Sequence, residues 1–292
     1  IEVQILADHH GRVLHLFERE CSIQRRHQKV IEESPAPHMT TGLRDRLTAA
    51  AVSATRAAGY RNAGTVEFLV EGEGDDASVA FLEMNTRLQV EHPVTEAVTG
   101  RDLVHAQLAI ASGAALPWSQ DQISLRGHAI ECRVYAENPT EGFLPDSGAL
   151  LRYREPVGPG IRVDAGVVAG SVVPSYYDAL LAKVISHADT RATALARARA
   201  ALGRFVVLGV QTNIELVGRT LRHPRMVEGR VDTTFFESEL DGLLREAAAD
   251  ERPGLALSAA LALHDRLEPM SATGSTTTGH ADDPWTSLGG WR

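Results

Sequence analysis

Polar side chains are concentrated in one short stretch, Glu83-Met84-Asn85-Thr86-Arg87-Leu88-Gln89-Val90-Glu91-His92-Pro93. The stretch follows the apolar residues 80–82, which are typical of a buried strand, so a rigid element positions it. Oxygen ligands such as Glu83 and Asn85 suit Mg²⁺ or Mn²⁺, the planar fork of Arg87 matches a small oxyanion, and Glu91 can move a proton. The composition therefore predicts a reaction centre rather than a solvated strand end.

A second carboxylate is expected beside the first one. Residues 65–70 and 79–84 are rich in β-forming side chains and flank a turn-forming run at 72–76, so we predict a hairpin. The register that places Glu67 opposite Glu83 also places Phe68 opposite Leu82 and Val70 opposite Ala80. Neighbouring carboxylates repel unless a cation lies between them, which favours a shared divalent metal over the alternative that Glu67 faces water.

Two further stretches carry charges that could serve the same centre. The run Gln24-Arg25-Arg26-His27-Gln28-Lys29 follows a predicted strand, where its cations can converge on a phosphate, although a charged surface loop is an equal alternative. From Gly127 onward, apolar and polar residues alternate. The alternation places Glu131 and Arg133 on one face of a strand and Ile130 on the other.

Bulk composition excludes several classes of function. The 292 residues fit one large or two ordinary domains, and a net charge of -9 argues against broad binding to nucleic acid or to an anionic membrane. No apolar run approaches the length of a membrane span. The only cysteines, Cys21 and Cys132, have neither zinc-type spacing nor a disulfide framework. We predict a soluble protein of the reducing cytoplasm that acts on a small molecule.

The element pattern predicts an α+β fold. Helices are expected at residues 43–58, at 96–112, from a cap at Asp189 over 191–205, and near 212–221 and 234–248. Short strands separated by glycine and proline between residues 127 and 173 are typical of an antiparallel sheet. The chain opens at Ile1 within an alternating pattern and is interpreted as a fragment, and residues 249–292 as a linker or tail.

Taken together, Glu67, the stretch 83–93, the stretch 21–29 and the stretch 127–133 resemble biotin carboxylase. The resemblance covers roughly residues 1 to 245, judged by motif order. It implies the C-terminal portion of an ATP-grasp domain at residues 1–122, followed by a biotin carboxylase C-terminal domain at 123–248 with an antiparallel sheet and covering helices. Residues 249–292 would lead toward a missing downstream region.

The resemblance also assigns roles to single residues. Glu67 and Glu83, assisted by Asn85, would hold two Mg²⁺ or Mn²⁺ ions. Bicarbonate would be bound by Arg87 with Lys29, Gln89 and the backbone of Val90, and deprotonated by Glu91. Arg133 would stabilise the enolate of biotin. The nucleotide ATP would contact Gln24, His27 and Leu69.

The implied reaction is the ATP-dependent carboxylation of biotin that a separate carrier domain holds. The stretch beyond residue 249 favours an acetyl-, propionyl- or methylcrotonyl-CoA carboxylase α chain, which works with a carboxyltransferase β subunit and forms a homo-oligomer. Pyruvate and urea carboxylases remain alternatives, as does a non-catalytic remnant that only dimerises. The isolated chain is expected to be inactive.

Overall fold

The computed structural model describes residues 1–245, which belong to one compact unit. The predicted linker at 249–292 lies outside the described residues. The helices are α1 (Thr41–Ala57), α2 (His92–Thr99), α3 (Leu103–Ala111), α4 (Arg191–Leu202), α5 (Ile214–Thr220) and α6 (Pro224–Glu228), with short 3₁₀ turns at Gln120–Gln122 and Pro139–Glu141. Residues 235–245 are also helical.

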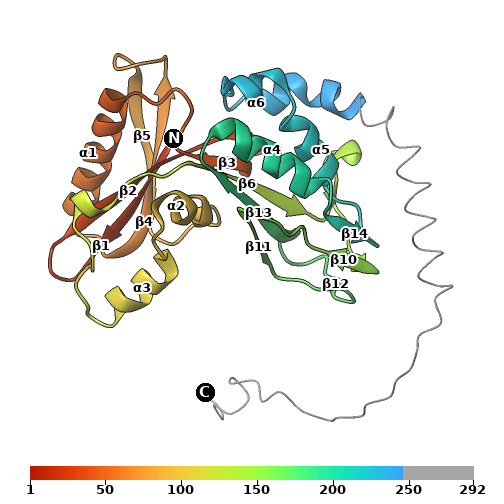
Figure 1. The fold of residues 1–292 in the computed structure, drawn as a ribbon, viewed down its shortest axis with the longest axis horizontal. Helices are drawn as coiled ribbons and strands as arrows, with labels where there is room; N and C mark the ends of the chain where they lie inside the picture. The colour runs from red at the N-terminus through yellow and green to blue at the C-terminus, as the bar shows by residue number, and fades with distance from the viewer. Residues whose placement is uncertain (246–292) are drawn as a thin grey trace, which may run out of the picture. The chain divides into compact units, whose positions relative to one another are not determined.

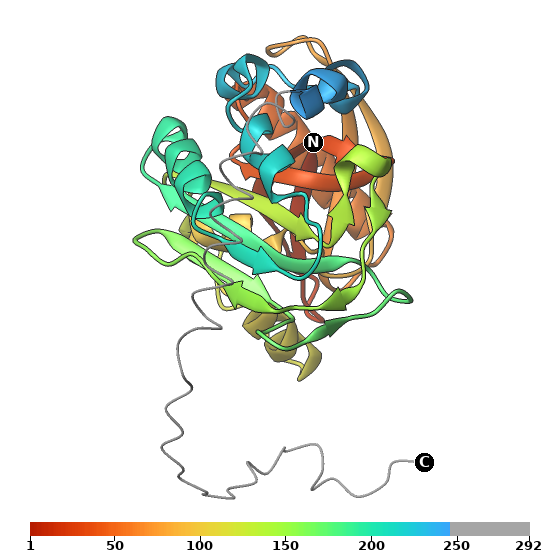
Figure 2. The same cartoon turned by 90° about the vertical axis from the view of Figure 1, so that its right-hand side faces the viewer.

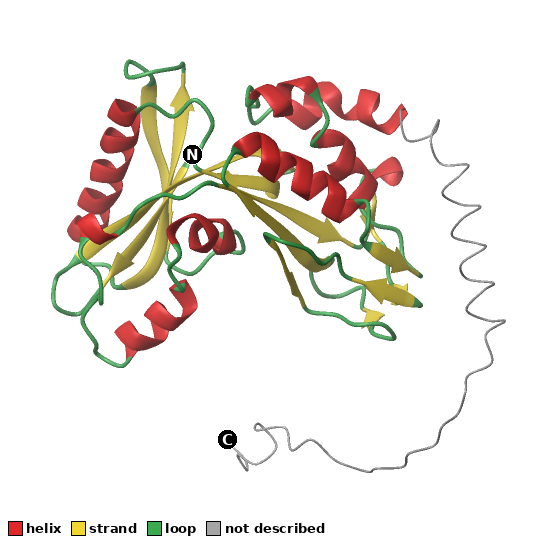
Figure 3. Cartoon of the chain, in the orientation of Figure 1, coloured by secondary structure: helices red, strands yellow, loops and turns green. Residues whose placement is uncertain are grey.

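One antiparallel sheet runs through the whole described part of the chain (Figures 1 and 3). Its strand order is β11-β13-β6-β3-β2-β1-β4-β5. The strands are β1 (Glu2–Ala7), β2 (Val13–Arg25), β3 (Gln28–Ser34), β4 (Asn62–Glu71), β5 (Ser78–Asn85), β6 (His128–Tyr135), β11 (Ile161–Ala165) and β13 (Leu180–Ala188). The remaining strands form two-stranded ribbons: β7 (Glu137–Asn138) with β8 (Leu144–Pro145), β9 (Gly148–Ala149) with β12 (Val172–Val173), and β10 (Arg152–Arg154) with β14 (Val206–Leu208).

The pairing of β3 with β6 joins the two predicted domains. Glu32 lies opposite Glu131, and Glu33 lies opposite Ile130. These partners are about a hundred positions apart in the sequence, so no local sequence pattern predicts that the two strands pair. The strands before residue 122 and β6, β11 and β13 after it therefore form one continuous sheet.

Helix α1 covers one face of the first half of the sheet. Strand alternation turns Val3 and Ile5 of β1 and Val66 of β4 toward Leu43 and Leu47 of α1, where they form a buried cluster. Thr40 caps the helix, because its side-chain oxygen accepts a hydrogen bond from the backbone N–H of Leu43. On the opposite face of β1 and β4, Leu6 and Ala63 pack with Leu103 of α3. The rest of that face carries the polar side chains of Glu2, Gln4, Thr65 and Glu67.

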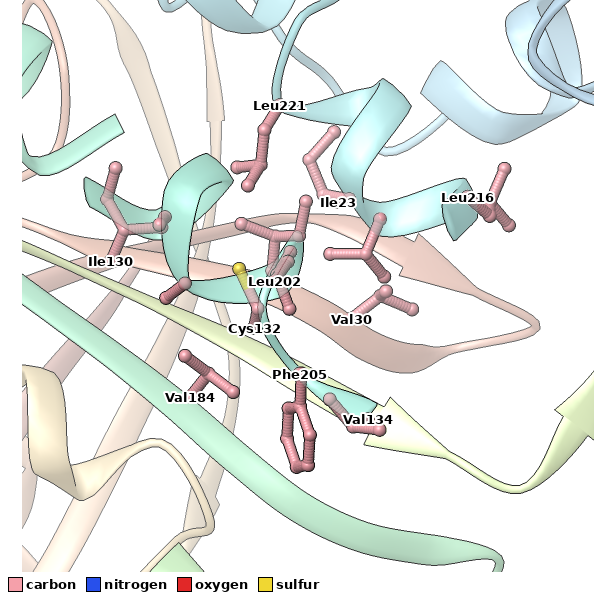
Figure 4. Close-up of a cluster of buried hydrophobic side chains, with 14 of the residues drawn as sticks. Ile23, Val30, Ile130, Cys132, Val134, Val184, Leu202, Phe205, Leu216 and Leu221 are labelled. Carbon is pink, nitrogen blue, oxygen red and sulfur yellow. The ribbon is translucent and has the colours of Figure 1, made fainter. Parts of the chain in front are cut away.

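The largest core lies under α4 and α5. Figure 4 shows Ile130, Cys132 and Val134 of β6 packed with Leu202, Phe205 and Leu216. In the turned view of Figure 2, α4 lies over β13 and β6. The alternate residues of β6, including Glu131 and Arg133, therefore point away from this core, as predicted.

Two helix predictions need correction. The expected single helix at 96–112 is two helices, α2 and α3, because Gly100 takes a left-handed conformation (φ 66°) and ends α2. Asp102 then caps α3. Helix α4 is capped by Thr190 rather than Asp189, and it ends at Leu202 instead of reaching residue 205.

The β4–β5 hairpin is also only partly as predicted. Glu67 lies opposite Glu83, but Phe68 lies opposite Phe81 and Val70 opposite Val79. A β-bulge inserts Leu82 as an extra residue in β5. A prediction that pairs the two strands residue by residue cannot anticipate such an insertion. The predicted α+β class is confirmed. Among the described helices, none is both long and apolar enough to cross a lipid bilayer.

Candidate active site

A cleft of about 1190 Å³ opens beside β4 and β5. All twelve residues predicted for the site line it: Gln24, His27, Lys29, Glu67, Leu69, Glu83, Asn85, Arg87, Gln89, Val90, Glu91 and Arg133. They come from β2, the β2–β3 turn, β3, β4, β5, β6 and the loop before α2. The fold therefore gathers residues that are up to about a hundred positions apart in the sequence.

Strand alternation explains why these side chains share a face. Because Val66 and Phe68 pack under α1, Glu67 and Leu69 must point to the other side of β4. The bulge in β5 lets both Leu82 and Glu83 line the cleft, since the extra residue breaks the alternation at that point. The bulge thus adds an apolar wall next to the paired carboxylates.

Glu91 lies between two cations at the base of the cleft. Its Oε1 accepts a hydrogen bond of 2.7 Å from Lys29 Nζ, and its Oε2 accepts one of 2.9 Å from an Nη atom of Arg133. The Glu91 residue is only 2% exposed, so these two contacts fix the orientation of its carboxylate. Each carboxylate oxygen keeps a further lone pair with which to accept a proton.

Lys29 connects three carboxylates of the cleft. Its ammonium donates to Glu2, to Glu67 at 2.9 Å and to Glu91. Burial alone would lower the pKa of Lys29, yet Cys21 and the three carboxylates raise that pKa above its ordinary value. Lys29 is therefore a permanent positive charge in the cleft.

Arg133 is the second fixed cation. Its Nε donates to Glu32 at 2.6 Å, and the guanidinium lies 3.4 Å from the Tyr135 hydroxyl. Burial disfavours its charge, but Glu32 and Glu91 raise the pKa of Arg133 well above its ordinary value. This side chain stays charged while reaching from β6 to the base of the cleft.

The donor set near β5 fits a hard divalent cation. Glu67 and Glu83 face the cleft from paired positions, and Asn85 Nδ2 donates to Glu67 Oε1 (3.1 Å) and Glu83 Oε1 (2.8 Å). Carboxylate oxygens are the ligands that Mg²⁺ and Mn²⁺ prefer. Asn85 currently holds the two carboxylates together through its nitrogen, so a ligand role for its oxygen requires the amide to turn over.

Arg87 offers free donors at the mouth of the cleft. Its side chain is exposed, and within the described residues it donates only to Asn85 Oδ1 (3.2 Å) and to the Leu88 carbonyl (3.5 Å). A guanidinium has five N–H groups, so several remain for an oxyanion. Beside it, Gln89 donates to Glu67 at 2.9 Å, and the Val90 carbonyl accepts from Lys183 at 2.8 Å.

The other end of the cleft suits a flat ligand with phosphates. Arg26 and His27 form the β2–β3 turn with positive φ angles (48° and 65°), so Gln24 and Lys29 project from the adjoining strands. Leu69 and Leu82 are each 53% exposed and line the same cleft. An apolar wall next to cations is the arrangement expected for a nucleotide base and its phosphates.

Comparisons with known proteins identify the family of the chain. Residues 1–119 match the family model of the carbamoyl-phosphate synthase L chain, ATP binding domain, and residues 131–238 match that of the biotin carboxylase C-terminal domain. The chain belongs to the biotin carboxylase family.

Relatives within the biotin carboxylase family are close in sequence. The chain is 50% identical to the biotin carboxylase of Halalkalibacterium halodurans over 240 residues, which is 82% of this chain and 52% of the relative. It is 49% identical to the mitochondrial methylcrotonoyl-CoA carboxylase subunit alpha of Glycine max over 247 residues, 85% of this chain and 34% of the relative. The chain thus spans about half or less of the length of these relatives.

A solved structure supports the same fold. The biotin carboxylase domain dimer of Hydrogenobacter thermophilus 2-oxoglutarate carboxylase, in complex with MgADP, ADP and bicarbonate, superimposes with a TM-score of 0.78 at 42% identity. The match covers 82% of this chain and 52% of that chain. The agreement extends over nearly all the described residues.

Several buried charges around the biotin carboxylase cleft were not found from the sequence. Glu2 and Arg19 lie on β1 and β2 behind Lys29, and Glu32 and Glu131 lie on β3 and β6 behind Arg133. Burial raises the pKa of Glu32 to about 7, although Arg133 opposes the shift. The available signal was a charged residue inside a predicted strand, and strand alternation alone would place such a residue in solvent.

Proposed function

We propose that this chain carries most of the catalytic residues of a biotin carboxylase. In this reaction, ATP activates bicarbonate as carboxyphosphate, and the carboxyl group passes to biotin on a carrier domain. The observation that carries the proposal is the Glu91 carboxylate held between Lys29 and Arg133 beside the free donors of Arg87. A base, two cations and an anion fork thus line one cleft.

Glu91 is the proposed general base for bicarbonate. Arg87 would bind two oxygens of the anion through its fork, with Lys29 and Gln89 as neighbouring donors. Bound there, bicarbonate would lie next to a Glu91 oxygen with a lone pair to spare. The proton would pass to that oxygen, and the general base would supply a rate factor of ~10² to 10⁴.

Glu67 and Glu83 are the proposed ligands of two Mg²⁺ or Mn²⁺ ions, with Asn85 assisting. Metal held by these residues would supply positive charge to neutralise the phosphates of the nucleotide. Gln24, His27 and Leu69 would contact ATP, because the first two adjoin the basic turn and Leu69 lies on the apolar wall.

Arg133 is proposed to act on biotin rather than on the nucleotide. Its guanidinium reaches the cleft from β6 and contacts the same carboxylate that serves as base. A permanent cation at this position would stabilise the negative charge that develops on the ureido group of biotin. Arg133 would therefore both orient the Glu91 carboxylate and stabilise the negative charge on biotin.

The proposed parent is an acyl-CoA carboxylase α chain of the acetyl-, propionyl- or methylcrotonyl type. It would work with a biotin carrier domain and a carboxyltransferase β subunit, and it would form a homo-oligomer. The chain spans 34% of its methylcrotonoyl-type relative, so acceptor and partners belong to this proposal. Cytoplasmic location also stays a prediction, and that relative is named as mitochondrial.

The test is Glu91→Gln in a complete biotin carboxylase that contains this sequence. We expect biotin carboxylation to fall by ~10² to 10⁴ while nucleotide affinity changes little, because the amide keeps the shape but cannot take the proton. The matched control is Glu71→Gln, which makes the same change on the exposed end of β4, outside the cleft. Near-normal turnover of the Glu91 variant would refute the base role.

A further inference from the structure

Arg19 is a completely buried guanidinium in the middle of β2. It has no part in the cleft lining, yet it lies directly behind the residues that do. An arginine has five N–H groups, and here each of them has an acceptor. Nε donates to Glu2 (2.5 Å), one Nη to Gln4 (2.8 Å) and Thr95 (2.9 Å), and the other Nη to Thr65 (3.2 Å) and Gln89 (3.0 Å).

These acceptors belong to four separate parts of the chain. Glu2 and Gln4 lie on β1, Thr65 on β4, Thr95 on α2, and Gln89 in the loop that also carries Arg87 and Glu91. Arg19 therefore connects the functional loop, residues 86–91, to the sheet through hydrogen bonds on the side away from the cleft. The planar fork of a guanidinium holds such partners in fixed directions, which the ammonium of a lysine cannot do.

The contact with Gln89 has a consequence for the chemistry of the cleft. A glutamine amide can present either its oxygen or its NH₂ group to a neighbour. Arg19 has no acceptor atom, so only the oxygen of Gln89 can face it. The NH₂ group must then point the opposite way, where it donates to Glu67 at 2.9 Å and lines the cleft.

The same logic is visible at the neighbouring amide. Gln4 also turns its oxygen toward Arg19, and its NH₂ group donates to the carbonyl of Gly64 at 3.0 Å. Gln4 is buried and lies outside the cleft, so its amide serves the sheet alone. Arg19 therefore sets the direction of two amides, of which only Gln89 has an NH₂ group in the cleft.

We propose that Arg19 is a positioning residue that fixes Gln89 as a hydrogen-bond donor to the oxyanion substrate. This inference rests on the proposed function, because bicarbonate is the oxyanion. One Gln89 N–H is taken by Glu67, and the second is free to donate to an anion bound at Arg87. Without Arg19, the amide is free to turn its oxygen toward the anion and repel it.

The test uses Arg19→Lys in a complete biotin carboxylase that contains this sequence. Lysine keeps the charge next to Glu2 but loses the fork that reaches Gln89. Losing a hydrogen bond to a charged partner should raise the KM for bicarbonate ~10- to 100-fold. The KM for ATP should change less than twofold. Thr95→Val is the matched control, since it removes another acceptor of Arg19 and should lower the melting temperature without changing the KM for bicarbonate.

A double variant separates positioning from general stability. Gln89→Met removes the donor, so adding Arg19→Lys to it should raise the KM for bicarbonate no further. Two independent effects that multiply would overturn the inference. If Arg19→Lys does not fold, Gln89→Glu decides. Its carboxylate keeps an oxygen toward Arg19 but has no N–H to donate, so it should raise the KM for bicarbonate, and an unchanged KM would overturn the inference.

Failure of the proposed function gives a different result. Wild-type protein without bicarbonate-dependent ATP cleavage would overturn the proposed function and this inference with it. Normal wild-type turnover combined with an unchanged bicarbonate KM in Arg19→Lys would overturn only the role of Arg19.

Discussion

Glu131→Gln is expected to stabilise the folded chain at neutral pH. Glu131 lies in β6 directly opposite Glu32, is fully buried, and neither of its oxygens has a hydrogen-bond partner among the described residues. Burial and then Glu32 raise the pKa of Glu131 well above its ordinary value, although Lys183 and Arg133 oppose the shift. The folded protein therefore releases the Glu131 proton at a higher pH than the unfolded chain does.

The magnitude follows from proton linkage. Unfolded chains release this proton near pH 4.5, the ordinary value for Glu, whereas the folded chain retains it. The folded state then binds one proton more than the unfolded state, so stability falls by ~1.4 kcal/mol per pH unit above that value. The loss accumulates as pH rises above the ordinary value and stops growing once the folded carboxyl ionises.

Glutamine has the shape of the protonated acid but does not titrate. Its NH₂ group can donate to Glu32 Oε2, which is buried without a hydrogen-bond partner among the described residues. The free energy of unfolding of Glu131→Gln should therefore exceed that of the wild-type chain by an amount that grows from pH 5 to pH 7.5. Urea unfolding of the 292-residue chain across this range measures the difference.

Glu33→Gln is the matched control on the neighbouring strand. Glu33 is equally buried, but it pairs with Arg191 (2.7 and 2.9 Å) and His128 (2.6 Å). Burial alone would raise the pKa of Glu33, yet these partners lower it, so its charge stabilises the fold above the ordinary value and less as pH falls. The two variants should change stability in opposite directions. Parallel pH profiles of wild type and Glu131→Gln would refute the reasoning, since they require an ionised Glu131.

Two further predictions concern a complete biotin carboxylase that contains this sequence. Arg133→Ala should reduce biotin carboxylation more than bicarbonate-dependent ATP cleavage, and equal losses in the two assays would contradict a role at biotin. It should also destabilise the protein by ~3 to 5 kcal/mol in urea unfolding, because Glu32 and Glu91 lose a buried cation, and Glu32→Gln added to it should restore part of that loss. Glu83→Gln should raise the Mg²⁺ concentration needed for half-maximal ATP cleavage, whereas an unchanged Mg²⁺ dependence would exclude Glu83 as a ligand.

The parts of the fold that local patterns encode were predictable. Alternation and a turn signal placed Glu67 opposite Glu83, and the apolar spacing from Leu43 onward identified α1. The predicted residues of the functional loop do line one cleft, because they follow the end of a regular strand. Their roles in the reaction stay predictions.

The bulge at Leu82 adds one residue without changing the β-forming character of the strand. Gly100 interrupts a helical period that continues through it, because residues on both sides remain apolar at helical spacing.

The buried charges behind the cleft were missed for another reason. Whether Glu131 faces water or a neighbouring strand depends on the β3–β6 pairing, which is set by tertiary structure. Arg19 likewise becomes buried only when β1, β4 and α2 surround it. Charged residues inside strands thus deserve separate consideration in sequences of this kind.

In the shared sheet, the portion up to residue 122 and the C-terminal portion each supply the strand that pairs with the edge of the other. A polypeptide ending at residue 122 would present β3 as an open edge with unpaired backbone groups and the carboxylates of Glu32 and Glu33 stripped of Arg133, His128 and Arg191. The C-terminal portion alone would expose β6 in the same way. Open edges of this kind recruit strands from other molecules and promote aggregation. The two portions are therefore expected to fold without aggregating only when they are part of one polypeptide.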